Sequence, residues 1–428
     1  MDIQQVYQQI KNSGGVSTDT RTIRPGMVFF AFKGDNFDAN AFVQQALDEG
    51  ASLVITQNEN FREHPDCFYT TDSLRTLQDV AALHRKTLKS IIIGITGTNG
   101  KTTTKELIRE ALSSVGSVQA TQGNLNNHIG VPLTLLSIND ETDFAIVEMG
   151  ANHPGEIDLL CNIARPDYGV ITNIGRAHLE GFGSFEGVIK TKTELYRFIA
   201  ANGRKVFVNE NDEMLMQLSK EQPRILYGME SLNAEVVSDE NPQLRCIWNW
   251  HGTTYYTETN LTGNYNLPNV LAAIGIALHF GGKPEDISRK LSEYKPSNMR
   301  SQWVDTGRNQ LILDAYNANP SSMAVALKNF AALKTDNKLP ILGDMLELGS
   351  YSNEEHRKVL EILKDLNFTT AVLIGPSFSK FSSEFPSYQF FPDTAEAKTA
   401  LTKSDISGCA VLLKGSRGIG VDSLKDIF

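Results

Sequence analysis

An apolar run that ends in a glycine-rich loop constrains the fold of this chain more than any other feature. Residues 90–96 read Ser-Ile-Ile-Ile-Gly-Ile-Thr, and residues 97–103 continue with Gly-Thr-Asn-Gly-Lys-Thr-Thr. The next residues, Lys105-Glu106-Leu107-Ile108, favour a helix. The order of strand, loop and helix is typical of a phosphate-binding loop.

The residue types in this loop suit nucleotide phosphates. Glycines let consecutive backbone N–H groups turn toward phosphate oxygens, Lys101 supplies a charge for the outer phosphates, and the Thr102 hydroxyl can hold Mg²⁺. The common pattern has glycine at position 95, where this chain has Ile95, so the loop is a variant. We therefore expect ATP binding and use, with contacts from Gly97, Thr98, Asn99, Gly100, Lys101, Thr102 and Thr103.

Composition narrows the class of protein and its partners. The chain has 428 residues, 41% of them hydrophobic, which predicts about three globular domains. Its formal charge of −10 argues against non-specific binding to nucleic acid or to an anionic membrane. No apolar run is long enough to cross a bilayer, and the first residues lack the pattern of a signal peptide. We expect a cytoplasmic monomer that does not insert into a membrane.

Hydrophobic patterning divides the chain into three α/β regions. Residues 1 to about 85 form a small unit, and residues 90–297 alternate strand-like and helix-like segments, which predicts a largely parallel sheet covered by helices. A linker-like segment at 295–298 precedes a second doubly wound region. The strands expected around the three regions are 27–32, 52–56, 144–147, 168–172, 205–208, 310–313, 339–342, 371–374 and 410–413, with helices at 41–47, 265–280 and 353–366.

Polar residues follow several of the predicted strands, where ligands of open α/β sheets gather. Glu148 ends the strand at 144–147, and a carboxylate there could bind the same Mg²⁺ as Thr102. An isolated glutamate at a strand end is usually only solvated. The phosphate loop upstream favours the metal hypothesis.

The loop after residues 168–172 carries a histidine with two possible roles. His178 could complete a second cation site, although a loop histidine more often makes ordinary hydrogen bonds and Mg²⁺ prefers oxygen ligands. Lys190 and Lys192 lie on the helix that follows, where two lysines could form a solvated face. The residues alone do not choose between these alternatives.

Two asparagine-rich segments are also ambiguous. Asn126 and Asn127 lie in the segment 124–134, which suits either a polar ligand or a turn capped by asparagines. Asn266 and Asn269 would share one face of the helix at 265–280 and could hydrogen-bond the edge of an adenine ring.

Taken together, these clusters resemble the Mur ligases of bacterial peptidoglycan synthesis. The variant loop Gly-x-Thr-Gly-Thr-Asn-Gly-Lys-Thr-Thr, Glu148, His178, Lys192 and the pair of Asn266 and Asn269 occur in the order found in that family. The segments 124–134, 148–156, 177–184 and 314–320 resemble the family member that adds D-Ala-D-Ala to UDP-N-acetylmuramoyl-tripeptide. The resemblance extends from Asp19-Thr20-Arg21 to Lys414-Gly415-Ser416-Arg417.

The resemblance implies an α/β protein of three domains. These are a small N-terminal domain for the UDP end of the substrate (1–88), a central P-loop ATPase-like domain (89–297), and a Rossmann-like C-terminal domain for the incoming dipeptide (298–428). It further implies an ATP-dependent ligase with two Mg²⁺ ions. Lys101, Glu148, His178 and Lys192 are the implied catalytic residues.

The resemblance also assigns roles to individual residues. A carbamylated Lys192 would bind the second Mg²⁺ together with His178, while Thr102 and Glu148 bind the first. The remaining implied contacts are Asp314 with the ribose of ATP, Arg300 with the ribose or phosphates, Asn317 and Asn319 near the dipeptide, and Asp19, Arg21 and Lys33 at the UDP end.

Two kinds of alternative share the variant loop. A sister ligase or a folylpolyglutamate synthase would add a single amino acid instead of a dipeptide. A protein of another class would hydrolyse ATP only to change shape. The segment Tyr316-Asn317-Ala318-Asn319-Pro320 and the asparagine-rich loop at 124–134 argue against the first kind. Dependence of ATP turnover on a carboxylate substrate distinguishes the second.

Overall fold

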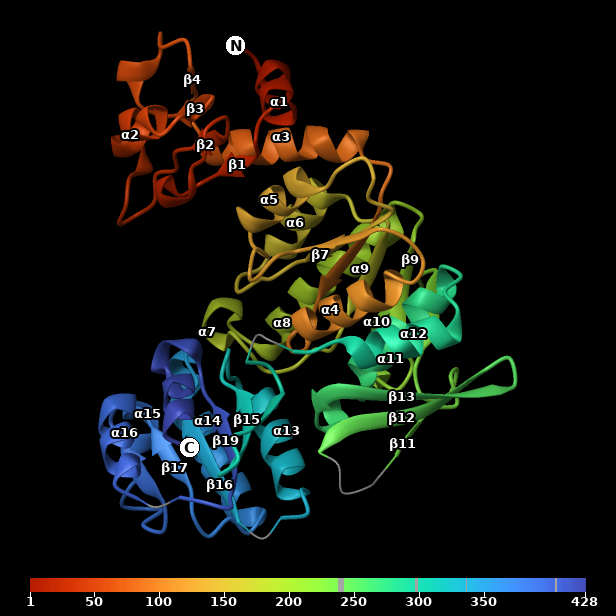
Figure 1. The fold of residues 1–428 in the computed structure, drawn as a ribbon, viewed down its shortest axis with the longest axis vertical. Coiled ribbons are helices and arrows are strands. Elements are labelled where there is room, and N and C mark those ends of the chain that lie inside the picture. The colour runs from red at the N-terminus through yellow and green to blue at the C-terminus, as the bar shows by residue number, and fades with distance from the viewer. Residues whose placement is uncertain (238–241, 297–298, 336, 405) are drawn as a thin grey trace.

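Three β-sheets organise the chain along its length in the computed structural model (Figure 1). The structure describes residues 1–237, 242–296, 299–335, 337–404 and 406–428. The predicted linker at 295–298 therefore lies partly outside the described residues. In the described part of the chain, no helix is long and apolar enough to cross a membrane.

The N-terminal sheet has four parallel strands in the order β1-β2-β3-β4. Its buried residues, such as Val28 and Ile55, pack against Val6 of the first helix and Leu77 of the third. The predicted strands and helix in this region are confirmed. The elements are α1 (Ile3–Lys11), β1 (Val16–Ser17), β2 (Val28–Phe30), α2 (Val43–Asp48), β3 (Leu53–Thr56), β4 (Cys67–Tyr69) and α3 (Ser73–Thr87).

The central sheet has six strands, all parallel, in the order β10-β9-β8-β5-β7-β6. This agrees with the prediction of a parallel sheet covered by helices. Its strands are β5 (Ile91–Thr96), β6 (Val118–Ala120), β7 (Phe144–Glu148), β8 (Tyr168–Ile171), β9 (Lys205–Asn209) and β10 (Arg224–Tyr227). Its helices are α4 (Lys101–Leu112), α5 (Gly130–Ser137), α6 (Glu156–Ala164), α7 (Leu179–Phe182), α8 (Phe185–Lys192), α9 (Glu194–Ala201), α10 (Glu213–Leu218), α11 (Leu267–His279) and α12 (Pro284–Glu293).

Alternate side chains of the central strands fill two cores, one on each face of the sheet. Ile93 of β5 packs with Leu107 of α4 and Val270 of α11. The neighbouring Ile92 packs on the opposite face with Leu160 of α6 and Leu195 of α9. Because both faces are covered by helices, the carboxyl-end edge of the strands, with its loops, is where polar side chains can meet a ligand.

The third sheet combines an antiparallel and a parallel part. Its nine strands run in the order β11-β12-β13-β14-β15-β19-β16-β17-β18. Strands β11 to β15 pair antiparallel, and β15, β19, β16, β17 and β18 pair parallel. The strands are β11 (Glu235–Val236), β12 (Gln243–Trp250), β13 (Thr253–Thr262), β14 (Gln302–Asp305), β15 (Gln310–Asp314), β16 (Lys338–Gly343), β17 (Val372–Ile374), β18 (Gln389–Phe391) and β19 (Ala410–Lys414).

The four predicted C-terminal strands and the helix at 353–366 are confirmed, and the parallel strands are covered by helices. The helices of this region are α13 (Pro320–Ala331), α14 (Ser352–Asp365), α15 (Pro376–Ser379) and α16 (Thr394–Thr402). The β12–β13 hairpin was not predicted. Its turn residues His251 and Gly252 both have positive φ (48° and 83°), a conformation that joins the strands of tight hairpins.

Candidate active site

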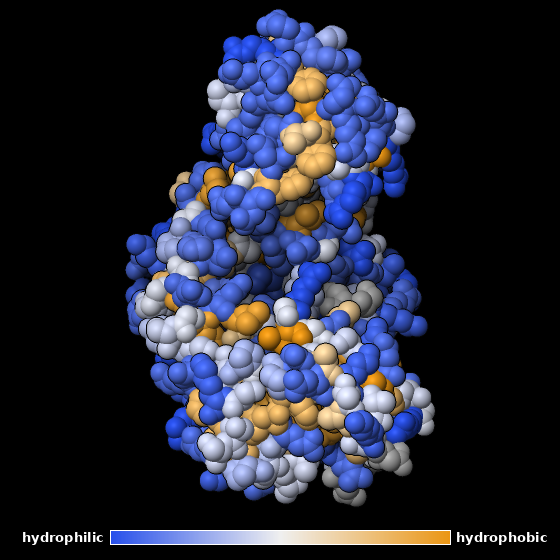
Figure 2. All heavy atoms as spheres, turned by 90° about the vertical axis from the view of Figure 1, so that its left-hand side faces the viewer, coloured by the Kyte–Doolittle hydropathy of each residue, from blue (hydrophilic) through white to orange (hydrophobic). Residues whose placement is uncertain are grey.

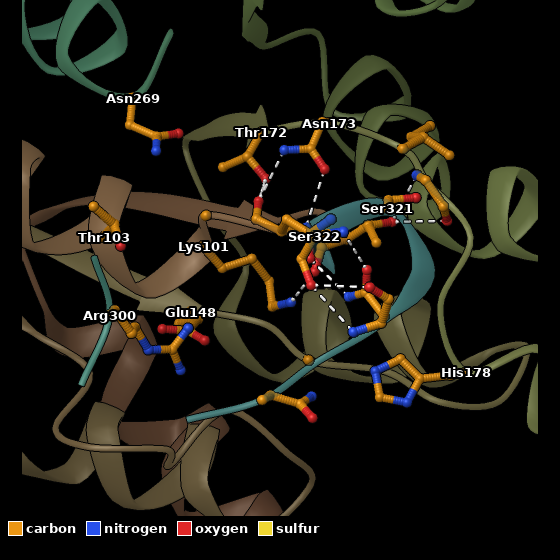
Figure 3. Close-up of a pocket in the computed structure, with 18 of the residues that line it drawn as sticks. Lys101, Thr103, Glu148, Thr172, Asn173, His178, Asn269, Arg300, Ser321 and Ser322 are labelled. Atoms are coloured by element: carbon orange, nitrogen blue, oxygen red, sulfur yellow. Dashed lines mark hydrogen bonds between the residues drawn. The ribbon is translucent and has the colours of Figure 1, made fainter. Parts of the chain in front are cut away.

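A cavity of about 1260 Å³ lies where the carboxyl ends of the central strands face the C-terminal part of the chain. Lys101, Glu148 and His178 line it from the central part, and Asp314, Asn319 and Lys414 line it from the C-terminal part. In Figure 3, Lys101, Glu148, Arg300 and His178 surround one space, with Ser321 and Ser322 of α13 close to Asn173. The cavity therefore joins chemistry from two regions far apart in sequence.

The phosphate loop has the backbone shape that the sequence predicts. Gly97 and Gly100 have φ values of 143° and 78°. A Cβ atom at Gly97 would lie 2.0 Å from Oγ1 of Thr172, and one at Gly100 would lie 2.9 Å from Oδ1 of Asn269. Only glycine suits these two positions, and the open N–H groups at the start of α4 form a cradle of the kind that holds phosphate.

Lys101 begins α4 and folds back over the loop. Its Nζ donates hydrogen bonds to the carbonyl oxygens of Gly97 (2.9 Å) and Thr98 (3.1 Å). Burial lowers the pKa of this amine, Glu148 opposes that effect and Arg300 adds to it. The lysine is thus held at the loop by two neutral carbonyl groups, which an incoming anion can replace as partners.

Thr102 and Glu148 meet as predicted. Oγ1 of Thr102 donates to Oε2 of Glu148 at 2.9 Å, and Nδ2 of Asn126 donates to Oε1 of the same carboxylate at 2.9 Å. Glu148 is almost completely buried. Within the described residues, no three His, Cys, Asp or Glu side chains form a metal-binding group. A hydroxyl and one carboxylate fit Mg²⁺ bound mainly through phosphate oxygens and water.

His178 faces the C-terminal part of the chain. It precedes the first residue of α7 and has a φ of 50°, and its Nδ1 forms a hydrogen bond with Oε2 of Glu347, which lies just after β16. The hydrogen bond to His178 lowers the pKa of Glu347. Glu347 was not predicted as a site residue, because its position near His178 depends on the packing of two distant regions.

Lys192 differs sharply from Lys190 on the same helix. Lys192 is 2% exposed, whereas Lys190 is exposed to solvent. The Nζ of Lys192 lies 3.4 Å from the carbonyl oxygen of Ala151 and 5.4 Å from the centre of the Phe182 ring. Burial, with help from the charge of Lys101, lowers the pKa of Lys192 to about 7. The alternative of a solvated lysine face applies to Lys190 alone.

The residues expected around the nucleoside gather beside the phosphate loop. Nδ2 of Asn269 donates to Oδ1 of Asn266 (3.0 Å), and Thr104 donates to Oδ1 of Asn269 (3.0 Å). Arg300 lies 4.0 Å from the centre of the Tyr316 ring, and its Nε atom is buried without a hydrogen-bond partner. An unsatisfied buried donor that belongs to a cavity-lining residue fits a site for an oxygen-rich ligand.

Asp314, the residue expected at the ribose of ATP, lines the cavity from the C-terminal part. Its Oδ2 accepts a hydrogen bond of 2.6 Å from Nζ of Lys414, which is buried. The sequence did not single out Lys414 as a site residue, although the pattern of a lysine at the end of a strand and before Gly415 could have indicated one.

The asparagines of the remaining segments divide between ligand-facing and capping roles. Asn126 contacts Glu148, whereas Oδ1 of Asn127 accepts the N–H groups of Ile129 and Gly130 and so caps a turn. The capped turn is therefore present at Asn127, and both asparagines line the cavity. Asn317 also lines the cavity, and its Oδ1 accepts the N–H group of Ala318.

Asn319 joins the two halves of the site. Its Oδ1 caps the first turn of α13 by accepting the N–H group of Ser322, and its Nδ2 donates to Oδ1 of Asn99 in the phosphate loop (2.7 Å). Asn173 also contacts this loop, since its Oδ1 accepts the N–H group of Asn99 (3.0 Å).

The residues expected at the UDP end lie in the N-terminal unit and do not line this cavity. Asp19 caps a short helix and forms a salt bridge of 2.6 Å with Arg21. The backbones of Lys33 and Asp38 form an isolated antiparallel β-bridge.

Comparison with known proteins accounts for this arrangement. Residues 95–277 match the family model of the Mur ligase middle domain, and residues 299–417 match that of the Mur ligase glutamate ligase domain. A ligase of Bacillus subtilis, named UDP-N-acetylmuramoyl-tripeptide--D-alanyl-D-alanine ligase, is 33% identical over 96% of this chain and 93% of its own length. The chain belongs to the Mur ligase family.

Other relatives of this Mur ligase resemble it along its full length. A protein of Escherichia coli with the same name as the Bacillus ligase is 32% identical over 96% of the chain and 92% of its own length. A crystal structure of MurF from Acinetobacter baumannii has a TM-score of 0.87 at 28% identity and covers 99% of this chain and 97% of that one. MurF of Thermotoga maritima in complex with ADP has a TM-score of 0.85 at 25% identity, covering 97% and 96%.

Proposed function

We propose that this Mur ligase joins D-Ala-D-Ala to UDP-N-acetylmuramoyl-tripeptide with the use of ATP. The observation that carries the proposal is one cavity shared by a phosphate loop, the Thr102–Glu148 pair and side chains of the C-terminal part. The names of relatives that match nearly the whole chain support the choice of substrates. The enzyme would act as a monomer in the cytoplasm.

The reaction needs ATP because a carboxylate does not acylate an amine at neutral pH. Transfer of the γ-phosphoryl group to the terminal carboxylate of the tripeptide makes an acyl phosphate and releases ADP. The amine of the dipeptide then attacks the acyl carbon. A C–N bond forms, the C–O bond to phosphate breaks, the nitrogen loses a proton, and inorganic phosphate leaves.

Lys101 and the loop N–H groups would stabilise the phosphates as charge shifts during the first transfer. The Nε–H group of Arg300, which has no hydrogen-bond partner in the structure, can donate to the same phosphates. Thr102 and Glu148 would hold a Mg²⁺ ion, which supplies positive charge to the phosphate oxygens when bound. Asn126 keeps the Glu148 carboxylate oriented through its hydrogen bond of 2.9 Å.

We assign a second cation position to His178 and a carbamylated Lys192. As found, an imidazole and an amine are poor ligands for Mg²⁺, and addition of CO₂ to Nζ would give a carboxylate-like group with oxygen donors. The burial of Lys192 and its pKa of about 7 favour this modification, because CO₂ adds to a neutral amine. The exposed Lys190 lacks this environment.

We divide the remaining substrate contacts among the three parts of the chain, with boundaries at 1–88, 89–297 and 298–428. Asn266, Asn269 and Asp314 would bind the nucleoside of ATP, and Asn126 and Asn127 would bind the tripeptide substrate. The other assignments are the dipeptide to Asn317 and Asn319, and the UDP end to Asp19, Arg21 and Lys33.

Product analysis tests this proposal. The chain is incubated with ATP, Mg²⁺, UDP-N-acetylmuramoyl-tripeptide and either D-Ala-D-Ala, D-Ala or another single amino acid, and the products are identified by mass spectrometry. We expect a pentapeptide product that requires the dipeptide. Addition of a single amino acid would overturn the substrate assignment, and full ATP turnover without tripeptide would favour an ATP-driven switch.

A further inference from the structure

Glu347 places a carboxylate at the point where the two halves of the cavity meet. It lines the cavity from the segment after β16, and its side chain contacts His178 from the loop after β8. More than half of the Glu347 side chain is exposed, so the carboxylate remains open to a ligand. None of the roles assigned above uses this residue.

The backbone around Glu347 is held in an unfavourable conformation. Glu347 and His178 have φ values of 62° and 50°, which residues other than glycine rarely adopt. Hydrogen bonds fix the segment before Glu347. The N–H group of Met345 donates to Nε2 of His356, and that of Leu346 donates to Oγ of Ser416, both at 3.0 Å. The fold thus directs this carboxylate toward the cavity.

The charges on the C-terminal side of the cavity single out this carboxylate. Among the described residues that line the cavity from this side, the acidic ones are Asp314 and Glu347. Asp314 is neutralised by Lys414, 2.6 Å away and almost completely buried. Glu347 is therefore the carboxylate on that side that is placed to receive a cationic group from a ligand.

The acceptor of the proposed reaction brings such a group. D-Ala-D-Ala is a zwitterion with an ammonium group at one end and a carboxylate at the other. The ammonium group releases one proton to solvent before its nitrogen attacks, and the nitrogen loses the second proton as the amide forms. This nitrogen must reach the acyl carbon near His178, and Glu347 lies against His178. We propose that Glu347 binds the ammonium group of the incoming dipeptide and so determines that the acceptor is an amine. This inference rests on the proposed function.

The surroundings of Glu347 match the rest of a short dipeptide. Leu346 is 46% exposed, and a Cβ at Gly418 would lie 3.1 Å from its Cδ1, so an apolar surface adjoins the carboxylate. Ser416 accepts the hydrogen bond of Leu346, and the guanidinium of the next residue, the exposed Arg417, lies 5.8 Å from the centre of the Tyr316 ring, which lines the cavity. Arg417 carries the positive charge that suits the carboxylate end of the dipeptide, and we assign it to that end.

Steady-state kinetics of the full chain with Glu347→Gln tests the inference. The amide keeps the size of the side chain and removes its charge. We expect the KM for D-Ala-D-Ala to rise at least about tenfold, because a hydrogen bond between charged groups is lost, while the KM values for ATP and tripeptide stay within about twofold. Glu354→Gln, on an exposed residue paired with Lys358, is the matched control and should leave all three KM values unchanged.

A ligand that lacks the ammonium group gives the sharper readout. D-lactyl-D-alanine carries a hydroxyl in its place and competes with the dipeptide. The wild-type chain should bind it at least about tenfold more weakly than D-Ala-D-Ala, and Glu347→Gln should remove most of this difference. Equal discrimination by wild type and variant would overturn the inference.

A partial reaction separates ammonium binding from an effect on His178. With ATP and tripeptide but no dipeptide, reversible phosphoryl transfer scrambles labelled oxygen in ATP. We expect Glu347→Gln to leave this exchange unchanged. A loss of exchange as large as the loss of overall rate would assign Glu347 to the positioning of His178 and overturn the inference. If the wild-type chain makes the pentapeptide and Glu347→Gln has the same KM for D-Ala-D-Ala, this inference alone is overturned. If the wild-type chain makes no pentapeptide, the proposed function is overturned as well.

Discussion

At single residues of this Mur ligase, the local environment changes the chemistry of the side chain. Lys101 is the simplest case, because its partners in the structure are two neutral carbonyl groups of the phosphate loop. We predict that Lys101→Ala lowers kcat for ADP release by about a hundredfold or more, since it removes a charge that acts on the transferred phosphoryl group. Lys190→Ala, on an exposed lysine of α8, should leave kcat unchanged and serves as the control.

Lys192 gives a second prediction, on activity. Lys192→Ala should abolish turnover, and small carboxylic acids should restore part of it by supplying the oxygen ligands that the carbamate would provide. Mass spectrometry of the wild-type chain in bicarbonate should detect a CO₂ adduct on Lys192 and none on Lys190. An unmodified Lys192 in the active enzyme would contradict the assignment.

The same residue makes a prediction on stability. Because its pKa is 10.5 in the unfolded chain and about 7 in the folded one, the unfolded state binds more protons between these values. The contribution of Lys192 is therefore most unfavourable below pH 7 and is relieved as pH rises toward 10.5. Without CO₂, Lys192→Met should stabilise the fold at pH 7 by on the order of 1 kcal/mol and lose this gain near pH 10. Chemical denaturation measures the difference, and Lys190→Met should show no gain.

Sequence patterns indicate candidate site residues where the signal lies within one local segment. The glycines, Lys101 and Thr102 follow directly from one loop, and Glu148 follows from its place at the end of a strand. The choice between Lys190 and Lys192 depends on how deeply each side chain is buried. The sequence of one short helix does not show this, whereas the structure does. Glu347 and Lys414 are recognised only from their contacts with segments far apart in the chain, and hydrophobic periodicity does not predict such contacts.

At the scale of elements, α13 connects helix stability to the site. Asn319 caps this helix and also donates to Asn99. Asn319→Ala should lower the free energy of unfolding by about 1 kcal/mol and weaken activity, because both contacts are lost. Asn319→Ser keeps a capping oxygen, so it should retain stability and still weaken activity. Equal activity of Asn319→Ser and wild type would show that the contact with Asn99 has no role.

The elements themselves were predicted unevenly for a physical reason. Long apolar strands such as β5 and β19 are buried on both faces and give a strong signal. The hairpin of β12 and β13 has one solvated face, and its alternation of buried and half-buried residues resembles a surface segment when read without its partner. It was therefore missed.

Over the whole molecule, the central and C-terminal parts contact each other through the pairing of β13 with β14 and through side chains near the cavity. Arg176 donates its N–H group to Oγ of Ser321 (3.0 Å), and its guanidinium lies 3.6 Å from Glu355. Tyr351 packs against a small apolar cluster of Leu179, Phe182 and Val188. The face seen in Figure 2 is mainly hydrophilic, with apolar side chains in small groups.

The reaction needs an aligned site that excludes water, so we predict that the C-terminal part rotates onto the central part when ligands bind. The predicted hinge at 295–298 lies partly outside the described residues. Small-angle scattering should show a smaller radius of gyration with an ATP analogue and tripeptide than without ligands. An unchanged radius would contradict the rotation.

The proposed reaction activates a carboxylate by phosphoryl transfer and then joins it to the dipeptide. The most direct measurement follows a heavy oxygen isotope placed in the terminal carboxylate of the tripeptide. If an acyl phosphate forms, one labelled oxygen must appear in the inorganic phosphate released with each pentapeptide. Phosphate that carries no label, released at the full rate of ATP use, would contradict the account.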